Sequence, residues 1–114
     1  MQSKQPVFLG AEEETRPLLG LVDGTFSAGT PVTLSVQIND QAGQPITGDS
    51  PDLYYSRLDG SGREVRSGYL GEMELKKEGL YVYGLKESDV EKGLYEFEVV
   101  TNRGGKKRIR LLFI

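Results

Sequence analysis

Residues 94–114, LYEFEVVTNRGGKKRIRLLFI, decide the fold that we expect for this chain. Along residues 94–100 apolar and acidic side chains alternate, and a two-residue period places every second side chain on the same face of a strand. The second half of the stretch alternates in the same way, with Arg108, Arg110 and Leu112 between Ile109, Leu111 and Phe113. Gly104-Gly105 separates the two runs as a turn signal. The stretch therefore predicts a β-hairpin that buries Tyr95, Phe97 and Val99 on one face.

A second clear strand pattern lies in residues 30–39, where every second side chain is apolar. These apolar side chains are Val32, Leu34, Val36 and Ile38. Further β-prone runs follow at residues 52–58, 63–70, 73–77 and 80–83. Together the runs give about seven strands after residue 28, with turn signals about every 8 to 14 residues. This spacing predicts an all-β fold, an antiparallel β-sandwich.

Two of the connecting regions carry their own signals. Asp59-Gly60-Ser61-Gly62 is a hairpin turn, and the run 63–70 that follows it is poor in apolar residues, so we expect an edge strand there. Residues 86–92 are the one stretch that could form a helical turn, which Gly93 would close within two turns.

The first 27 residues differ from the rest of the chain. Apolar patches at residues 7–9 and 18–22 flank Glu12-Glu13-Glu14 without a clean period. We therefore divide the chain into an N-terminal extended arm, residues 1–27, and a β-sandwich domain, residues 28–114. Since a complete sandwich offers the patches little unfilled interior, we expect the arm to dock on a protein partner. The partner-binding residues would be Val7, Phe8, Leu9, Leu18 and Leu19. Residues 18–22 could instead be the first strand of the domain.

Composition narrows the function. The chain has 114 residues, a net charge of -3, no histidine and no cysteine. A disulfide, an imidazole general base and the usual zinc, copper or iron ligands are thereby excluded, so we expect no enzyme and no metal or cofactor. The N-terminus lacks the apolar stretch of a signal peptide, and no run approaches the length that spans a bilayer.

Glu91-Lys92-Gly93-Leu94-Tyr95 resembles the entry to the penultimate strand of immunoglobulin-like domains. The resemblance covers residues 28–114, which lack the cysteine pair and core tryptophan of true immunoglobulins, so it extends to the broad sandwich only. It implies that Tyr95 is a structural corner whose hydroxyl bonds to nearby backbone. Such modules occur on bacterial surface proteins and on phage virions as tail, baseplate or head-decoration parts, so the resemblance implies binding or scaffolding.

Two charged groups could carry other chemistry. A weak calcium site could use loop aspartates, although their spacing matches no known loop and turns favour aspartate anyway; they are Asp40, Asp49, Asp52 and Asp59. A basic cluster could contact phosphates, but glutamates on the partner strand favour a charge-balanced strand pair; the cluster is Arg103, Lys106, Lys107, Arg108 and Arg110. We expect no nucleic-acid, membrane or small-molecule ligand.

The expected function is a non-catalytic structural or interaction subunit of a larger multi-copy assembly, docking through its arm and sheet edges. Its partners would be proteins, including copies of itself. The expected setting is a phage virion or another extracellular assembly, reached without a signal peptide by a chain made in the cytoplasm. The alternative is a carbohydrate- or peptide-binding module that uses tyrosines exposed on one sheet face, for which Tyr54, Tyr69 and Tyr83 are the candidates.

Overall fold

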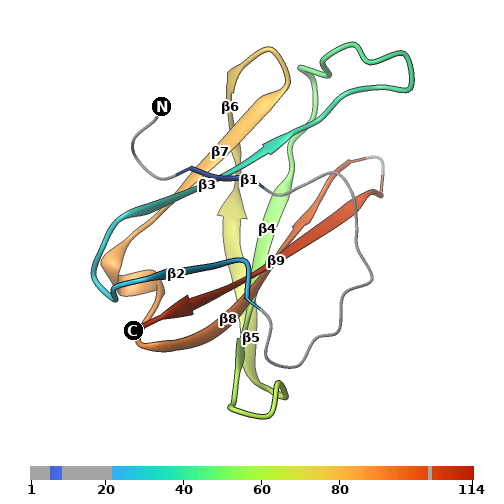
Figure 1. The fold of residues 1–114 in the computed structure, drawn as a ribbon. Helices are drawn as coiled ribbons and strands as arrows, with labels where there is room; N and C mark the ends of the chain where they lie inside the picture. Colours follow the sequence, from blue (N-terminus) through green and yellow to red (C-terminus); the bar gives the residue numbers. More distant parts are fainter. Residues whose placement is uncertain (1–5, 9–21, 103) are drawn as a thin grey trace.

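The C-terminal hairpin expected from the sequence lies within the larger of two sheets in the computed structural model, which describes residues 6–8, 22–102 and 104–114 (Figure 1). β8 (Gly93–Val100) pairs antiparallel with β9 (Lys106–Phe113) over all eight residues of each strand. The five-stranded sheet has the order β2-β9-β8-β4-β5. Its other strands are β2 (Gly24–Phe26), β4 (Asp52–Leu58) and β5 (Glu64–Glu72).

The four-stranded sheet packs against it in the order β1-β3-β7-β6. Its strands are β1 (Pro6–Phe8), β3 (Val32–Gln37), β7 (Leu80–Leu85) and β6 (Glu74–Lys77). The 3-10 helix η1 (Glu87–Asp89) is a single turn that precedes β8. It falls within the short helical turn expected there.

The core between the sheets consists of the side chains that the period-two patterns point inward. Tyr81, Tyr95, Phe97 and Phe113 are the largest fully buried side chains. Of the ten alternating apolar side chains that the sequence shows in the hairpin and in residues 30–39, nine are buried and Ile38 is partly buried. Ile38 lies one residue beyond the end of β3, where the chain enters the loop that bridges Asn39 to Pro45.

β5 is an edge strand, as its composition predicts, because β4 is its one neighbour among the strands of the described residues. Two register shifts interrupt this pairing, between Leu53 and Tyr54 and between Arg57 and Leu58. At each shift one extra residue of β5, Leu70 or Val65, has no register partner on β4. Between the two shifts Tyr54 therefore lies directly opposite Tyr69.

The sandwich is not wholly antiparallel, because the two strands described within residues 6–8 and 22–27 pair in parallel. β1 aligns Pro6–Phe8 with Thr33–Ser35 of β3, and β2 aligns Gly24–Phe26 with Leu111–Phe113 of β9. Phe26 packs beside Phe113, with ring centroids 6.2 Å apart. Residues 24–26 thus complete the edge of the larger sheet.

Candidate interaction surfaces

The outer face of the five-stranded sheet, hereafter the outer face, brings together residues that are far apart in the sequence. Antiparallel register aligns its side chains in rows that cross β9, β8, β4 and β5 in that order. One row is Lys106, Val100, Asp52 and Glu72. The next row is Arg108, Glu98, Tyr54 and Tyr69, and the row after that is Arg110, Glu96, Ser56 and Ser67. Basic residues therefore line β9, while acidic, aromatic and hydroxyl side chains lie toward β5.

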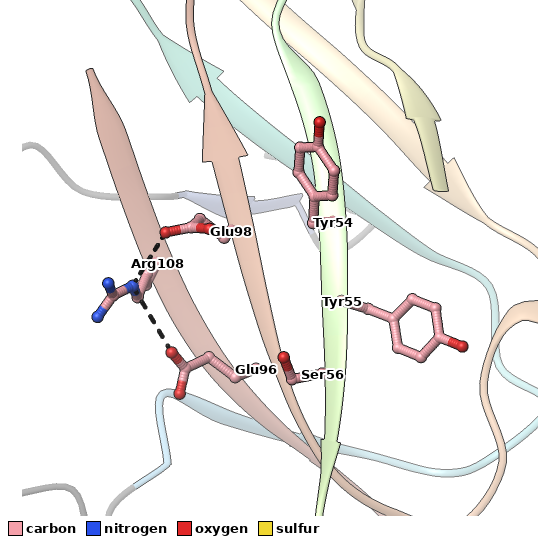
Figure 2. A pocket seen from close by; sticks show the side chains of 6 residues that line it. All are labelled: Tyr54, Tyr55, Ser56, Glu96, Glu98 and Arg108. Atoms are coloured by element: carbon pink, nitrogen blue, oxygen red, sulfur yellow. Dashed lines mark hydrogen bonds and ion pairs between the residues drawn. The ribbon is translucent and has the colours of Figure 1, made fainter. Parts of the chain in front are cut away.

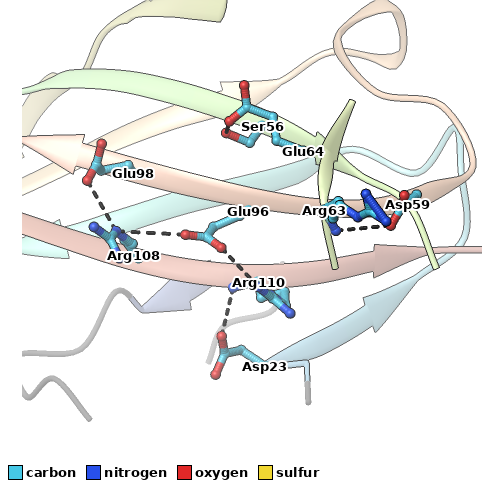
Figure 3. Close-up of polar contacts among 9 residues, drawn as sticks. All are labelled: Asp23, Ser56, Asp59, Arg63, Glu64, Glu96, Glu98, Arg108 and Arg110. Carbon is cyan, nitrogen blue, oxygen red and sulfur yellow. Dashed lines mark hydrogen bonds and ion pairs between the residues drawn. The ribbon is translucent and has the colours of Figure 1, made fainter. Parts of the chain in front are cut away.

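A ladder of ion pairs joins the β9 and β8 columns (Figure 3). Arg108 Nε lies 3.2 Å from a Glu98 carboxylate oxygen and 3.7 Å from one of Glu96. Arg110 Nη2 donates to the other Glu96 oxygen at 3.1 Å, and its backbone N–H donates to Asp23 at 2.7 Å. The charge-balanced strand pair predicted for this hairpin is confirmed. Arg103, which the basic cluster included, lies outside the described residues.

Two tyrosines form an exposed aromatic pair at the β4–β5 side of this face. Tyr54 is 39% exposed and Tyr69 55% exposed, with their ring centroids 5.2 Å apart. The Tyr69 hydroxyl donates a hydrogen bond to Asp52 Oδ1 at 2.8 Å, which fixes the ring. That bond and the nearby negative charges of Asp52 and Glu72 raise the pKa of Tyr69 to about 12.

A shallow hollow of about 330 Å³ lies between the aromatic pair and the ladder (Figure 2). Its outward-facing lining is Tyr54, Ser56, Glu96, Glu98 and Arg108. Tyr55 also borders it, but Figure 2 shows that its ring points away from Arg108, and it packs 6.2 Å from the core ring of Tyr95. The hollow is polar and open, so it fits a side chain of a partner surface better than an enclosed ligand.

Tyr83 does not belong to this face, so the three tyrosines that were candidates for the alternative function do not form one row. Tyr83 lies on β7 of the other sheet and packs, half-buried, against the core. Its hydroxyl donates to the carbonyl of Leu70 at 3.0 Å, and burial raises its pKa. Only register and sheet membership, which the sequence pattern does not give, separate it from Tyr54 and Tyr69.

Of the predicted partner-binding residues, Val7 and Phe8 lie in β1, where their backbone pairs with Leu34 and Ser35 of the same chain. Leu9, Leu18 and Leu19 lie outside the described residues. Val22, the last residue of the second apolar patch, is 37% exposed and precedes β2. Docking of the arm on a partner stays a prediction, and in the single chain β1 occupies the edge of its own β3.

Tyr95 braces the turn between η1 and β8. The side chain is fully buried, and its hydroxyl accepts the backbone N–H of Glu91 at 2.9 Å. The Arg57 guanidinium lies 5.5 Å from the centre of the Tyr95 ring and is held by Glu91 at 3.2 Å and by the Lys92 carbonyl at 2.8 Å. The hydrogen bond between the Tyr95 hydroxyl and the backbone of Glu91 is the contact that the resemblance implied for a corner tyrosine.

The loop aspartates are engaged by their own loops and neighbours. Asp40 accepts the backbone N–H groups of Ala42 and Gln44, both at 2.9 Å. Asp59 accepts those of Ser61 and Arg63, and these bonds, led by the one from Arg63, lower its pKa. In the described parts of the chain no three acidic side chains gather in a way that would hold a metal ion. The described residues also include no helix that is long and apolar enough to cross a membrane.

The strand order and the Tyr95 contact together define an immunoglobulin-like β-sandwich. A solved structure of the ZIG-8–RIG-5 IG1–IG1 heterodimer, in a monoclinic crystal form, is similar to the chain with a TM-score of 0.43 and 15% identity. The similarity covers 90% of this chain and 91% of that one. No protein-family model and no curated protein matches the chain.

Proposed function

We propose that the chain is a non-catalytic structural and interaction subunit of a multi-copy assembly, which docks through its N-terminal arm and its sheet edges. The observation that carries the proposal is β1. This strand of three residues adds in parallel to β3 and aligns with only Thr33–Ser35 of that six-residue strand. An edge strand presents unpaired backbone groups, and strand addition uses them without a preformed pocket.

If β1 of one chain paired with β3 of another chain, the same pairing would link two copies of the protein. β1 is separated in sequence from β2 by residues 9–23. A segment of that length spans up to about 50 Å when extended, which exceeds the 40 Å longest dimension of the fold. Exchange of an identical element between protomers leaves the contacts themselves unchanged, so it costs little.

The setting that we propose is a phage virion or another extracellular assembly. It is supported by the likeness of residues 28–114 to the immunoglobulin-like modules that such particles carry. A role without catalysis is supported by a sequence that holds neither histidine nor cysteine, the side chains on which most general bases and thiol nucleophiles depend.

Two truncations test the arm. Removing residues 1–14 deletes β1, whereas removing residues 1–5 keeps it and serves as the matched control. We expect the full chain and the shorter truncation to form particles larger than a dimer in multi-angle light scattering. The longer truncation should keep its β-type circular dichroism and lose these particles. Normal assembly without residues 1–14, or outright unfolding of that variant, would contradict the proposed docking.

A further inference from the structure

The charges of the outer face are asymmetric across the strands in a way that makes the face complementary to itself. Reading one row from β9 to β5 gives Lys106, Val100, Asp52 and Glu72, from basic to acidic. The next row gives Arg108, Glu98, Tyr54 and Tyr69, from basic to aromatic. Lys106, Arg108, Tyr69 and Glu72, the ends of these two rows, are all exposed.

A two-fold axis that joins two copies of this face lies in the interface plane, and its two limiting directions are perpendicular and parallel to the strands. An axis perpendicular to the strands places β9 on β9 and sets basic residues against basic residues. An axis parallel to the strands, passing between β8 and β4, reverses the order of the columns and places β9 on β5. Like charges repel and opposite charges attract across an interface, so the charge pattern selects the parallel axis.

With this axis each row of one copy faces the same row of the other copy, with the order of the strands reversed. Lys106 faces the partner subunit's Glu72, and by symmetry the reciprocal pair forms as well. Arg108 faces the partner subunit's Tyr69, where a guanidinium over a tyrosine ring gains a cation–π attraction. Asp52 holds that ring through a 2.8 Å hydrogen bond, so little side-chain freedom is lost on contact.

The size of the face limits the strength of the contact. Four strands about 4.8 Å apart span about 14 Å, and the three rows, about 6.7 Å apart, span about 13 Å. Such a patch is at or below the lower end of specific interfaces. Arg108 also keeps its own ion pair with Glu98 at 3.2 Å, which competes with a new partner. A reversible, concentration-dependent dimer is therefore the expected product.

We propose that two copies of this chain pair through their outer faces, about a two-fold axis parallel to the strands, with Lys106 opposite Glu72 of the second copy. This contact rests on the proposed multi-copy assembly and adds to it a surface distinct from the arm. Within one chain the two residues are three strand spacings apart, about 14 Å, which exceeds the Debye length at physiological salt. An interaction energy measured between Lys106 and Glu72 therefore reports the contact between two chains, because the two charges of one chain interact little.

Charge exchange in the full-length chain tests the pairing by sedimentation velocity over a concentration series, at the low concentrations where monomer and dimer precede the larger particles that the arm would link. Lys106→Glu and Glu72→Lys should each weaken the dimer about tenfold, because either change creates two like-charge contacts by symmetry. The double variant restores both contacts with reversed sign and should return to within about threefold of the unmodified chain. Lys76→Glu and Glu78→Lys, at exposed positions in and beside β6, make the same changes in net charge and should leave the dimer unchanged.

A second readout reports this face alone, whatever the arm does. Since the chain has no cysteine, Ser56→Cys introduces a single thiol near the axis, and Ser88→Cys introduces one in η1 as the control. A short bismaleimide should join two Ser56→Cys chains and not two Ser88→Cys chains, and Lys106→Glu should lower the yield. Equal yields from both thiols, or a double charge variant that stays as weak as the single ones, would overturn the proposed pairing. If the truncation of residues 1–14 loses the larger particles but still forms the Ser56→Cys crosslink, the arm contact and the outer-face contact are independent.

Discussion

A series of tyrosine-to-phenylalanine substitutions tests whether buried hydroxyls hold the loops of this sandwich in place. Each substitution removes one oxygen and leaves the ring. Tyr81 and Tyr95 are buried to 1% and 0% exposure, whereas Tyr69 is 55% exposed. Tyr95→Phe would keep the packing of the ring, since Phe113 meets the ring edge-on with centroids 5.6 Å apart and Phe97 stacks on it with centroids 5.8 Å apart.

The number of hydrogen bonds lost sets the expected order. Tyr81 accepts the N–H of Asp49 at 3.1 Å and donates to the carbonyl of Ile46 at 2.7 Å, so its variant loses two bonds. Tyr95 accepts one N–H, that of Glu91. A buried group left without a partner costs about 1–3 kcal/mol, so we expect losses of about 2–3 kcal/mol for Tyr81→Phe and about 1–2 kcal/mol for Tyr95→Phe. Tyr69→Phe removes an exposed bond and should cost less than about 0.5 kcal/mol.

Urea unfolding followed by circular dichroism measures these differences in unfolding free energy, with the same dependence on urea concentration expected for each variant. In thermal unfolding the melting temperature should fall by about 4 °C per kcal/mol for a chain of this size. A Tyr95→Phe variant as stable as the unmodified chain would contradict a bracing role for the buried hydroxyl. So would a Tyr69→Phe variant that loses as much stability as Tyr81→Phe, because the loss would then not follow burial.

Three further outcomes are expected. Phe97→Ala should cost about 3–5 kcal/mol in urea unfolding, since Phe97 is fully buried at the centre of the hairpin; a loss under about 1 kcal/mol would mean that the core is not packed as described. Gly79→Ala should cost about 1–3 kcal/mol, because Gly79 has φ +80° and an added Cβ would meet a backbone carbonyl oxygen at 2.8 Å; Gly84→Ala, with open space at the Cβ, is the control and should be nearly neutral. The phenol of Tyr69 should ionise near pH 12, measured as the difference in tyrosinate absorbance between the unmodified chain and Tyr69→Phe. Asp52→Ala should return the pKa of Tyr69 toward 10. Because this raised pKa favours the protonated phenol in the fold, its contribution to stability is present below pH 10 and is lost as pH rises toward 12, and an unshifted titration would contradict the Asp52 contact.

Sequence pattern was sufficient to predict the strands after residue 28 and the core-facing side chains of its alternating stretches. Alternation in residues 94–100 and 107–114 is a local property of a pleated strand with one buried face, so it predicts the β8–β9 hairpin and the burial of Phe97 and Ile109. The Gly-rich turns and the charged run at β5 are local signals as well, and they gave the connections and the edge strand.

The tertiary structure alone decided which strands lie side by side, and therefore which exposed residues share a surface. Tyr54 and Tyr69 meet because two bulges set the β4–β5 register, and Tyr83 lies in the other sheet although its sequence context is also that of a half-buried strand. The parallel addition of β1 to β3 joins residues about 27 positions apart, without a turn to fix the register. Strand periodicity specifies the face of each side chain, but pairing partners and register depend on contacts distant in sequence, and those contacts form only when the whole chain packs.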